Sequence, residues 1–342
     1  MKILFLTRYF YPHVGGVERH VYEVGKGMVK KGHEVVLLTD RFDKHLKSYE
    51  EIDGIKIYRF FQPNIKFVGL IFTWIWLLSN VKLILRSDVV HCHDVFIWYL
   101  PFRIIFPKKK VFTTFHGWET KFPIPFKNVL HKKIANKLSA GTMAVGEYVE
   151  KYYKIKTNLI SYGAAIIPSK TSKKVRNQLT YVGRLSKDTG LLVLLAALDL
   201  LKNSGSLDLK VDFCGDGELK ELCKKYGNVH GFTDPRPFLL NSRFLFAAGY
   251  LSVLEGLANK CIVLTAYDNE LKKNYYELTP FGKWIITSND PEVIAKNLIR
   301  NSISEKYSQK NIISGYNWVK EKSWKKLVKS YLNLWKQKSQ FV

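Results

Sequence analysis

The sequence is short of acidic residues. It holds 29 Asp and Glu against 54 Lys and Arg in 342 residues, and both halves of the chain share the resulting net charge of +25. This balance predicts attraction to something anionic, such as a lipid surface, nucleic acid or phosphorylated substrates. No signature of an RNA- or DNA-binding module is visible, so we expect no nucleic-acid partner.

Cysteines are few and do not have the spacing of a metal site; they are Cys92, Cys214, Cys223 and Cys261. Most lie in apolar stretches, which favours buried thiols in a reducing compartment. His91, His93 and Asp94 crowd one strand end too closely to indicate a metal centre. We therefore expect a cytoplasmic protein with no metal requirement.

Long uncharged runs are also missing. The apolar run from Phe67 to Val81 has 15 residues, whereas a helix that spans a bilayer needs roughly 20. We predict a buried helix there, followed by a strand at 88–91. The apolar part of residues 1–8 is too short for a signal peptide and predicts a first buried strand.

Strands and helices alternate along the whole chain, which predicts an α/β fold with parallel sheets. In the first half we expect strands at 1–8, 34–39, 55–58, 88–91, 111–115 and 142–145. A polar, basic link at 169–177 indicates a domain boundary. In the second half we expect strands at 178–182, 209–213, 244–248, 261–265 and 284–287, and helices at 191–203, 218–225 and 251–258.

Two glycine turns precede helices and are candidate anion sites. Gly249 lies between an apolar strand and a helix that contains Glu255, and Gly15 with Gly16 precedes the first helix. Such turns leave backbone N–H groups free at the positive end of a helix dipole, where phosphate binds well. An ordinary strand–helix connection explains each turn equally well when it is taken alone.

Residues 101–140 combine basic and apolar side chains with a single acid, Glu119. The basic residues are Arg103, Lys108, Lys109, Lys110, Lys121, Lys127, Lys132, Lys133 and Lys137, and they alternate with apolar residues such as Ile104, Trp118 and Phe126. This mixture suits adsorption to anionic headgroups. The alternative is a solvated basic face beside core residues. A last helix, 323–338, has one apolar face, and we expect it to dock across the domain boundary.

Six motifs follow one another along the chain: Tyr11-Pro-His-Val-Gly-Gly-Val-Glu18, Phe115-His-Gly117, Tyr181-Val-Gly-Arg-Leu185, Gly215-Asp-Gly217, Gly231-Phe-Thr-Asp234 and Leu254-Glu-Gly-Leu-Ala258. In these residues the chain resembles the retaining glycosyltransferases of family 4, which have the GT-B fold. The resemblance implies two Rossmann-like, doubly wound domains that face each other across a cleft. Residues 1–168 would bind the acceptor and 169–322 the nucleotide-sugar, while 323–342 would pack back on the first domain.

The resemblance also implies a set of site residues. His116 would lie over the reacting sugar and Arg184 would neutralise the diphosphate leaving group. Phe232 would help to hold the base and Glu255 the ribose. Donor-binding residues are expected at Gly15, Gly16, Gly183, Gly215, Gly231, Phe232, Gly249, Tyr250, Leu251, Ser252 and Glu255, and acceptor-binding residues at Tyr11, His13 and Glu18.

Two positions depart from the family pattern. Thr189 occupies the place of a lysine, for which Lys187 is our candidate substitute, and Ala247 occupies the place of a glutamate that contacts the donor sugar. The favoured hypothesis is a retaining transferase that moves a sugar from a nucleotide-diphosphate sugar to a glycan or lipid-linked acceptor, without a cofactor and with a peripheral place on the inner face of the cell membrane. The alternatives are a catalytically degenerate nucleotide-sugar or glycan-binding protein, favoured by Thr189 and Ala247, and a phosphorylase or synthase acting on soluble sugar phosphates.

Overall fold

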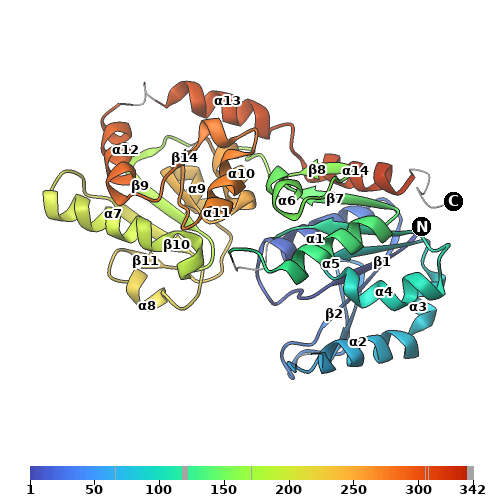
Figure 1. The fold of residues 1–342 in the computed structure, drawn as a ribbon. Helices are drawn as coiled ribbons and strands as arrows, with labels where there is room; N and C mark the ends of the chain where they lie inside the picture. The colour runs from blue at the N-terminus through green and yellow to red at the C-terminus, as the bar shows by residue number, and fades with distance from the viewer. Residues whose placement is uncertain (66, 118–121, 171, 305, 307, 337–342) are drawn as a thin grey trace. The chain divides into compact units, whose positions relative to one another are not determined.

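The chain folds into two compact units in the computed structural model, which describes residues 1–65, 67–117, 122–170, 172–304, 306 and 308–336. Unit 1 comprises Met1–Ser161 with Trp324–Val342, and unit 2 comprises Tyr162–Ser323 (Figure 1). Trp118, Glu119 and Lys121 of the basic stretch, and the end of the predicted last helix at 337–338, lie outside the described residues.

Unit 1 is built on an 8-stranded sheet of order β3-β4-β2-β1-β5-β6-β7-β8. All neighbours pair in parallel except β3 with β4. The strands are β1 (Lys2–Thr7), β2 (Glu34–Asp40), β3 (Tyr49–Ile52), β4 (Ile55–Phe60), β5 (Val89–His93), β6 (Val111–Phe115), β7 (Gly141–Val145) and β8 (Leu159–Ser161). The central strands are apolar and fully buried because helices cover both faces.

The helices of unit 1 are α1 (Gly16–Val29), α2 (Val68–Ser79), α3 (Val81–Arg86), α4 (Phe96–Ile105), α5 (Phe126–Leu138), α6 (Glu147–Tyr153) and α14 (Trp324–Lys336). α1 contacts α14, while α4 contacts both α2 and α5. Right-handed crossovers run in opposite directions from β1 to β2 and from β5 to β6, which places α1 and α4 on opposite faces of the sheet.

Helix α14 returns from unit 2 to pack on unit 1 (red in Figure 1). Its apolar face, which includes Leu327, Val328, Tyr331 and Trp335, is buried. A Cβ on Gly27 of α1 would lie 2.5 Å from Val328 Cγ2, so the glycine allows the two helices to approach closely.

Unit 2 is built on a 6-stranded parallel sheet of order β11-β10-β9-β12-β13-β14. The strands are β9 (Val175–Val182), β10 (Lys210–Cys214), β11 (Asn228–Val229), β12 (Ser242–Ala247), β13 (Ile262–Thr265) and β14 (Ile286–Thr287). The helices are α7 (Leu191–Ser204), α8 (Lys220–Cys223), α9 (Arg236–Asn241), α10 (Tyr250–Ala258), α11 (Glu270–Glu277), α12 (Pro291–Ile303) and α13 (Gln309–Val319), with single 3₁₀ turns at Lys187–Thr189 and Gly282–Trp284.

The predicted alternation of strands and helices is confirmed, and so is burial of the cysteines: all four thiols are buried and free. The structure divides the chain between Ser161 and Tyr162, earlier than the predicted boundary at 168, because Tyr162 packs on the rings of Tyr250, Phe281 and Trp318 in unit 2.

The prediction that the apolar run at 67–78 forms a buried helix is wrong in one respect. The helix forms as α2, but only Gly69, Thr73 and Leu77 of it are buried. Ile71, Phe72, Ile75 and Leu78 are exposed on its outer face. In the described part of the chain no helix is both apolar and long enough to cross a bilayer.

Candidate active site

The glycine turns of unit 2 gather at the carboxyl ends of its strands. Gly183 follows β9, Gly215 follows β10, and an isolated bridge pairs Gly215 with Gly231 beyond β11. A Cβ on Gly183, whose φ is +155°, would lie 2.2 Å from Ala248 Cβ, and one on Gly215 would lie 1.8 Å from the Gly183 carbonyl oxygen. These contacts leave no room for side chains, so bare backbone forms this edge of the sheet.

The turn from β12 to α10 belongs to the same edge, because the Ala248 N–H donates to the Val182 carbonyl at 3.2 Å. Its first two amides already have partners. The Gly249 N–H donates to Ser252 Oγ at 3.2 Å, and the Tyr250 N–H donates to the Tyr275 hydroxyl at 3.0 Å. Only the amides of Leu251 and Ser252 lack a partner among the described residues. The amides with which an anion could bond are therefore those of Leu251 and Ser252, in the first turn of α10, rather than those of Gly249 and Tyr250.

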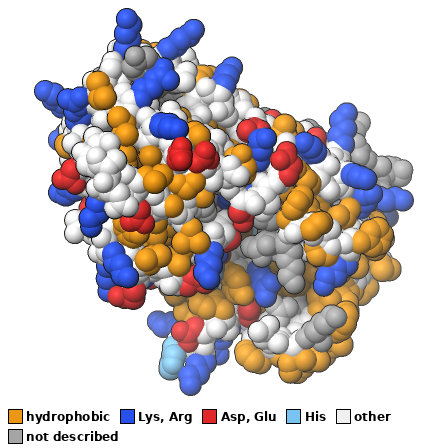
Figure 2. All heavy atoms as spheres, turned by 60° about the vertical axis from the view of Figure 1, so that its left-hand side comes forward, with side chains coloured by type: hydrophobic (Ala, Val, Ile, Leu, Met, Phe, Trp, Pro, Cys, Tyr) orange, Lys and Arg blue, Asp and Glu red, His pale blue; other side chains and the backbone are white. Residues whose placement is uncertain are grey.

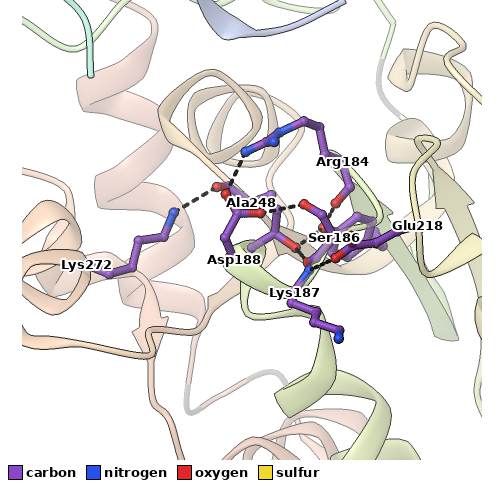
Figure 3. A network of polar contacts seen from close by, with 9 residues as sticks. Arg184, Ser186, Lys187, Asp188, Glu218, Ala248 and Lys272 are labelled. Carbon is purple, nitrogen blue, oxygen red and sulfur yellow. Dashed lines mark hydrogen bonds and ion pairs between the residues drawn. The ribbon is translucent and has the colours of Figure 1, made fainter. Parts of the chain in front are cut away.

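Arg184 extends from the β9 turn with a side chain that is 55% exposed. Its Nη2 lies 2.8 Å from Asp188 Oδ2, and Ser186 Oγ also donates to Asp188 at 2.5 Å (Figure 3). Burial opposes ionisation of Asp188, but the hydrogen bond from Ser186 and the charge of Arg184 outweigh it and lower the pKa of this carboxyl. Asp188 is thus an anionic partner that holds the guanidinium beside the turn.

Lys187 and Thr189 occupy the same short turn but face other ways. The Lys187 side chain points away from Arg184 in Figure 3, and its backbone N–H donates to Glu218 Oε1 at 3.2 Å. Thr189 is buried, accepts a hydrogen bond from the Tyr181 hydroxyl at 2.9 Å and donates to the Ser186 carbonyl at 2.6 Å. The structure therefore does not bring the Lys187 ammonium group to Arg184.

A second cation does approach this turn. Lys272 in the first turn of α11 is only 7% exposed, and its Nζ lies 3.4 Å from the Ala248 carbonyl oxygen (Figure 3). No sequence motif indicates that Lys272 lies at this turn, because nothing in the local sequence distinguishes it from the adjacent Lys273.

Glu255 and Phe232 lie at opposite extremes of exposure. Glu255 on α10 is 3% exposed. Burial raises the pKa of Cys214, at the end of β10, to about 12, and the negative charge of Glu255 acts in the same direction. Phe232 is 53% exposed beside Gly231, whose φ of +68° favours glycine. Both residues follow strands that end at the glycine edge, and their donor-binding roles stay predictions.

His116 of unit 1 is buried, and its expected place over the reacting sugar stays a prediction. Its Nε2 lies 2.8 Å from His93 Nδ1, its N–H donates to the Asp94 carboxylate, and its carbonyl accepts from the Tyr148 hydroxyl at 3.3 Å. The ring belongs to a histidine cluster, His20, His91, His93 and His116, which lies under α14. Desolvation lowers the pKa of all four histidines, and those of His91 and His116 fall to about 3.

The expected acceptor residues come together at the start of α1. Glu18 is buried, and its Oε1 lies 2.8 Å from His13 Nδ1. A Cβ on Gly15 would lie 2.4 Å from Glu18 Oε2, whereas the space around Gly16 is open. The carboxylate of Glu18 thus lies beside Gly15, near which the prediction placed the donor phosphates. Tyr11 is partly buried, and its carbonyl accepts a hydrogen bond from Arg59 at 2.7 Å.

Unit 1 also has a pocket between α4 and α5. Its lining includes Asp94, Phe96, Leu100, Phe115 and Lys132. Lys132 is buried, and its Nζ lies 3.1 Å from Asp94 Oδ1. The pocket is therefore lined by this ion pair and by apolar side chains. Among the described residues no cluster of His, Cys, Asp or Glu has the geometry of a metal site.

Comparison with solved structures identifies the fold. A sucrose-phosphate synthase from Thermosynechococcus elongatus superposes with a TM-score of 0.76 at 12% identity, over 98% of both chains. HepE from Anabaena, solved in complex with UDP and glucose, gives 0.70 at 13% identity, over 97% of this chain and 99% of that one. The chain therefore has the GT-B fold.

Sequence comparison adds a match in the first half of the chain. Residues 14–157 match the model of Glycosyltransferase Family 4, which confirms the expected resemblance. The uncharacterised glycosyltransferase MJ1069 of Methanocaldococcus jannaschii is 22% identical over 98% of both chains. A phosphatidylinositol N-acetylglucosaminyltransferase component from Arabidopsis thaliana is 31% identical over 103 residues, which are 28% of this chain and 22% of that protein.

Proposed function

We propose that this protein transfers a sugar from a nucleoside diphosphate sugar to an acceptor and retains the configuration at the anomeric carbon. One observation carries the proposal: β9 and β12 are neighbouring parallel strands, so Arg184 after β9 and the amides of Leu251 and Ser252 after β12 lie at the same edge of the unit 2 sheet. Backbone N–H groups at a helix N-terminus and a guanidinium group are the partners that a diphosphate prefers.

In the proposed reaction the bond between the anomeric carbon and the diphosphate oxygen breaks, and its electron pair leaves with the diphosphate. The acceptor oxygen bonds to the anomeric carbon on the same face and gives its proton to an oxygen of the leaving diphosphate. Arg184 and the helix amides offset the negative charge that develops on the leaving group. Because the leaving group serves as base, Ala247 in place of a glutamate does not remove a proton acceptor.

We further propose that the acceptor is presented at an anionic membrane surface. Ile104 and Ile105 at the end of α4, and Phe126 at the start of α5, are 76%, 55% and 79% exposed. Exposed lysines accompany them at 108, 110, 127, 133 and 137. Helix α2, which also has exposed apolar side chains, contacts α4. The named activity of the Arabidopsis relative, which acts on phosphatidylinositol, supports a lipid acceptor.

Not every basic residue of the stretch at 101–140 is available for that surface. Arg103 is buried and donates to the Pro107 carbonyl, and Lys109 Nζ donates to the carbonyls of Leu85 and Ser87. Lys132 pairs with Asp94. These three residues hold α4 and α5 in place, so headgroup attraction is left to the exposed lysines.

The test is turnover of a donor panel by the purified protein. UDP-, GDP- and ADP-sugars are incubated with vesicles that contain lipid extract, and the released diphosphate and any new glycolipid are measured. An axial or equatorial anomeric proton in the product, read by NMR, distinguishes retention from inversion. Diphosphate binding without release from any donor would favour the degenerate binding protein, and an inverted product would contradict the retaining mechanism.

A further inference from the structure

Lys272 is a buried cation with few direct polar contacts in unit 2. Its Nζ has one hydrogen-bond partner among the described residues, the Ala248 carbonyl at 3.4 Å, and it makes no ion pair there. The rings of Tyr275 and Tyr276 lie 4.9 and 5.4 Å from the nitrogen. A buried ammonium group normally has full hydrogen bonding or a carboxylate partner, so this arrangement is costly unless an anion completes it.

The position of Lys272 indicates which anion that is. Ala248 immediately precedes Gly249, and in Figure 3 the Lys272 ammonium and the Arg184 guanidinium approach the same turn from two sides. Helix α11 is fixed to this turn, because Tyr275 stacks on Tyr250 at 3.9 Å and accepts the Tyr250 N–H. Both cations therefore border the backbone edge on which the donor diphosphate is proposed to lie.

We propose that Lys272 is a donor-binding residue that contacts the diphosphate together with Arg184. The inference rests on the proposed function and adds a residue to its site. Thr189 cannot serve, because its hydroxyl is buried in hydrogen bonds with Tyr181 and Ser186. Lys272 supplies the second positive charge from a different element, α11, at a short distance from the turn.

The charge of Lys272 is set by its surroundings. Desolvation lowers its pKa to about 8; Arg184 acts in the same direction, and Asp188 and Asp268 oppose it. Tyr275 and Tyr276 have pKa values raised by burial and stay neutral. Lys272 is thus largely cationic at pH 7 and loses its charge as the pH rises above 8, whereas Arg184 keeps its charge. A bound diphosphate will raise the pKa of the lysine.

The experiment compares binding of UDP, GDP and ADP with binding of the matching nucleosides by calorimetry. In Lys272→Met the diphosphate affinity should fall by about tenfold or more while nucleoside affinity is kept, because a charge-assisted phosphate contact is lost. Lys272→Arg should bind within about threefold of the wild type. Lys273→Met, a neighbouring lysine of the same helix, is the matched control and should bind normally.

Two outcomes separate the claims. If the wild type binds none of the diphosphates, the proposed function fails and this inference fails with it. If the wild type binds but Lys272→Met binds equally well, only the role of Lys272 is overturned. Should Lys272→Met not fold, the pH dependence decides: the wild-type affinity should fall between pH 7.5 and about 9, and Lys272→Arg should show no such fall. An equal decline in both proteins would overturn the inference.

Discussion

At the scale of single residues, the glycine edge of the unit 2 sheet forms because its turns contain residues without side chains. Gly183, Gly215 and Gly231 let three turns meet, and a Cβ at Gly183 or Gly215 would overlap neighbouring backbone or side-chain atoms. The sequence predicted the turns at Gly183 and Gly215 because a turn is a local feature, and the donor-binding role of these glycines stays a prediction. The motifs could not show that Lys272 reaches the same turn, because that contact joins α11 to Ala248, just after β12, across 24 residues of sequence.

We predict that Gly183→Ala lowers the free energy of unfolding of unit 2 by about 1–3 kcal/mol, the usual range for overpacking or an unfavourable backbone conformation. The added methyl would meet Ala248, and φ of +155° is unfavourable for alanine. Urea unfolding measures the change. Gly16→Ala is the control: open space surrounds it, and alanine favours the helix. Equal stability of the two variants would contradict the crowding.

The histidine cluster predicts acid sensitivity of unit 1. The four rings are neutral when buried and take up protons only on unfolding, so stability is full above pH 6.5 and falls as the pH drops toward about 3. Each ring contributes up to about 1.4 kcal/mol per pH unit. His20→Gln, which keeps a partner for Tyr331, should reduce the slope by one proton, whereas exposed His45→Gln should not. An unchanged slope in His20→Gln would contradict this.

At the scale of elements, sequence periodicity predicted most helices and strands, and it failed where context decides. Helix α14 has a clear apolar face, so its burial could be predicted. Helix α2 is apolar almost all round, and such a pattern does not tell a buried helix from one exposed on a membrane-facing surface. The burial of the histidine cluster involves α14, which lies more than 200 residues away in sequence and contacts His20 and Thr114 through Tyr331.

Helix α14 is held by its tyrosine as well as by apolar packing. The Tyr331 hydroxyl lies 2.8 Å from His20 Nε2 and 3.0 Å from Thr114 Oγ1. Tyr331→Phe removes the hydroxyl that bonds to His20 and Thr114, and it should lower the free energy of unfolding by about 1–3 kcal/mol. Tyr316→Phe is the control, since that hydroxyl has no partner among the described residues. Calorimetry or urea unfolding measures both, and equal stabilities would show that the hydroxyl contributes nothing.

At the scale of the whole molecule, both halves of the sequence carry the excess of basic residues. Lys and Arg side chains are scattered across the face seen in Figure 2 rather than gathered in one patch. The sequence predicted the GT-B fold from its six collinear motifs, and the fold comparison confirms it. Composition alone could not define the proposed membrane-binding surface, because it does not distinguish exposed Lys127 from buried Lys132.

We predict that Ile104→Ser with Phe126→Ser weakens binding to anionic vesicles by about tenfold or more, because two side chains that are 76% and 79% exposed lose their apolar contact with lipid. Co-sedimentation at low and high salt measures it, and salt should weaken the wild type through screening of the lysines. The control is Ile303→Ser with Ile313→Ser on unit 2, which are also exposed. Equal losses in both double variants would contradict the assigned surface.

The most direct test of the account is nucleoside diphosphate binding by the wild type and Arg184→Ala, measured by calorimetry with Arg300→Ala on the exposed face of α12 as the control. The account predicts that at least one of UDP, GDP and ADP binds. It predicts that Arg184→Ala weakens this binding by about tenfold to a hundredfold and that Arg300→Ala leaves it unchanged. Equal affinity of Arg184→Ala and the wild type would contradict diphosphate capture at the glycine edge of unit 2.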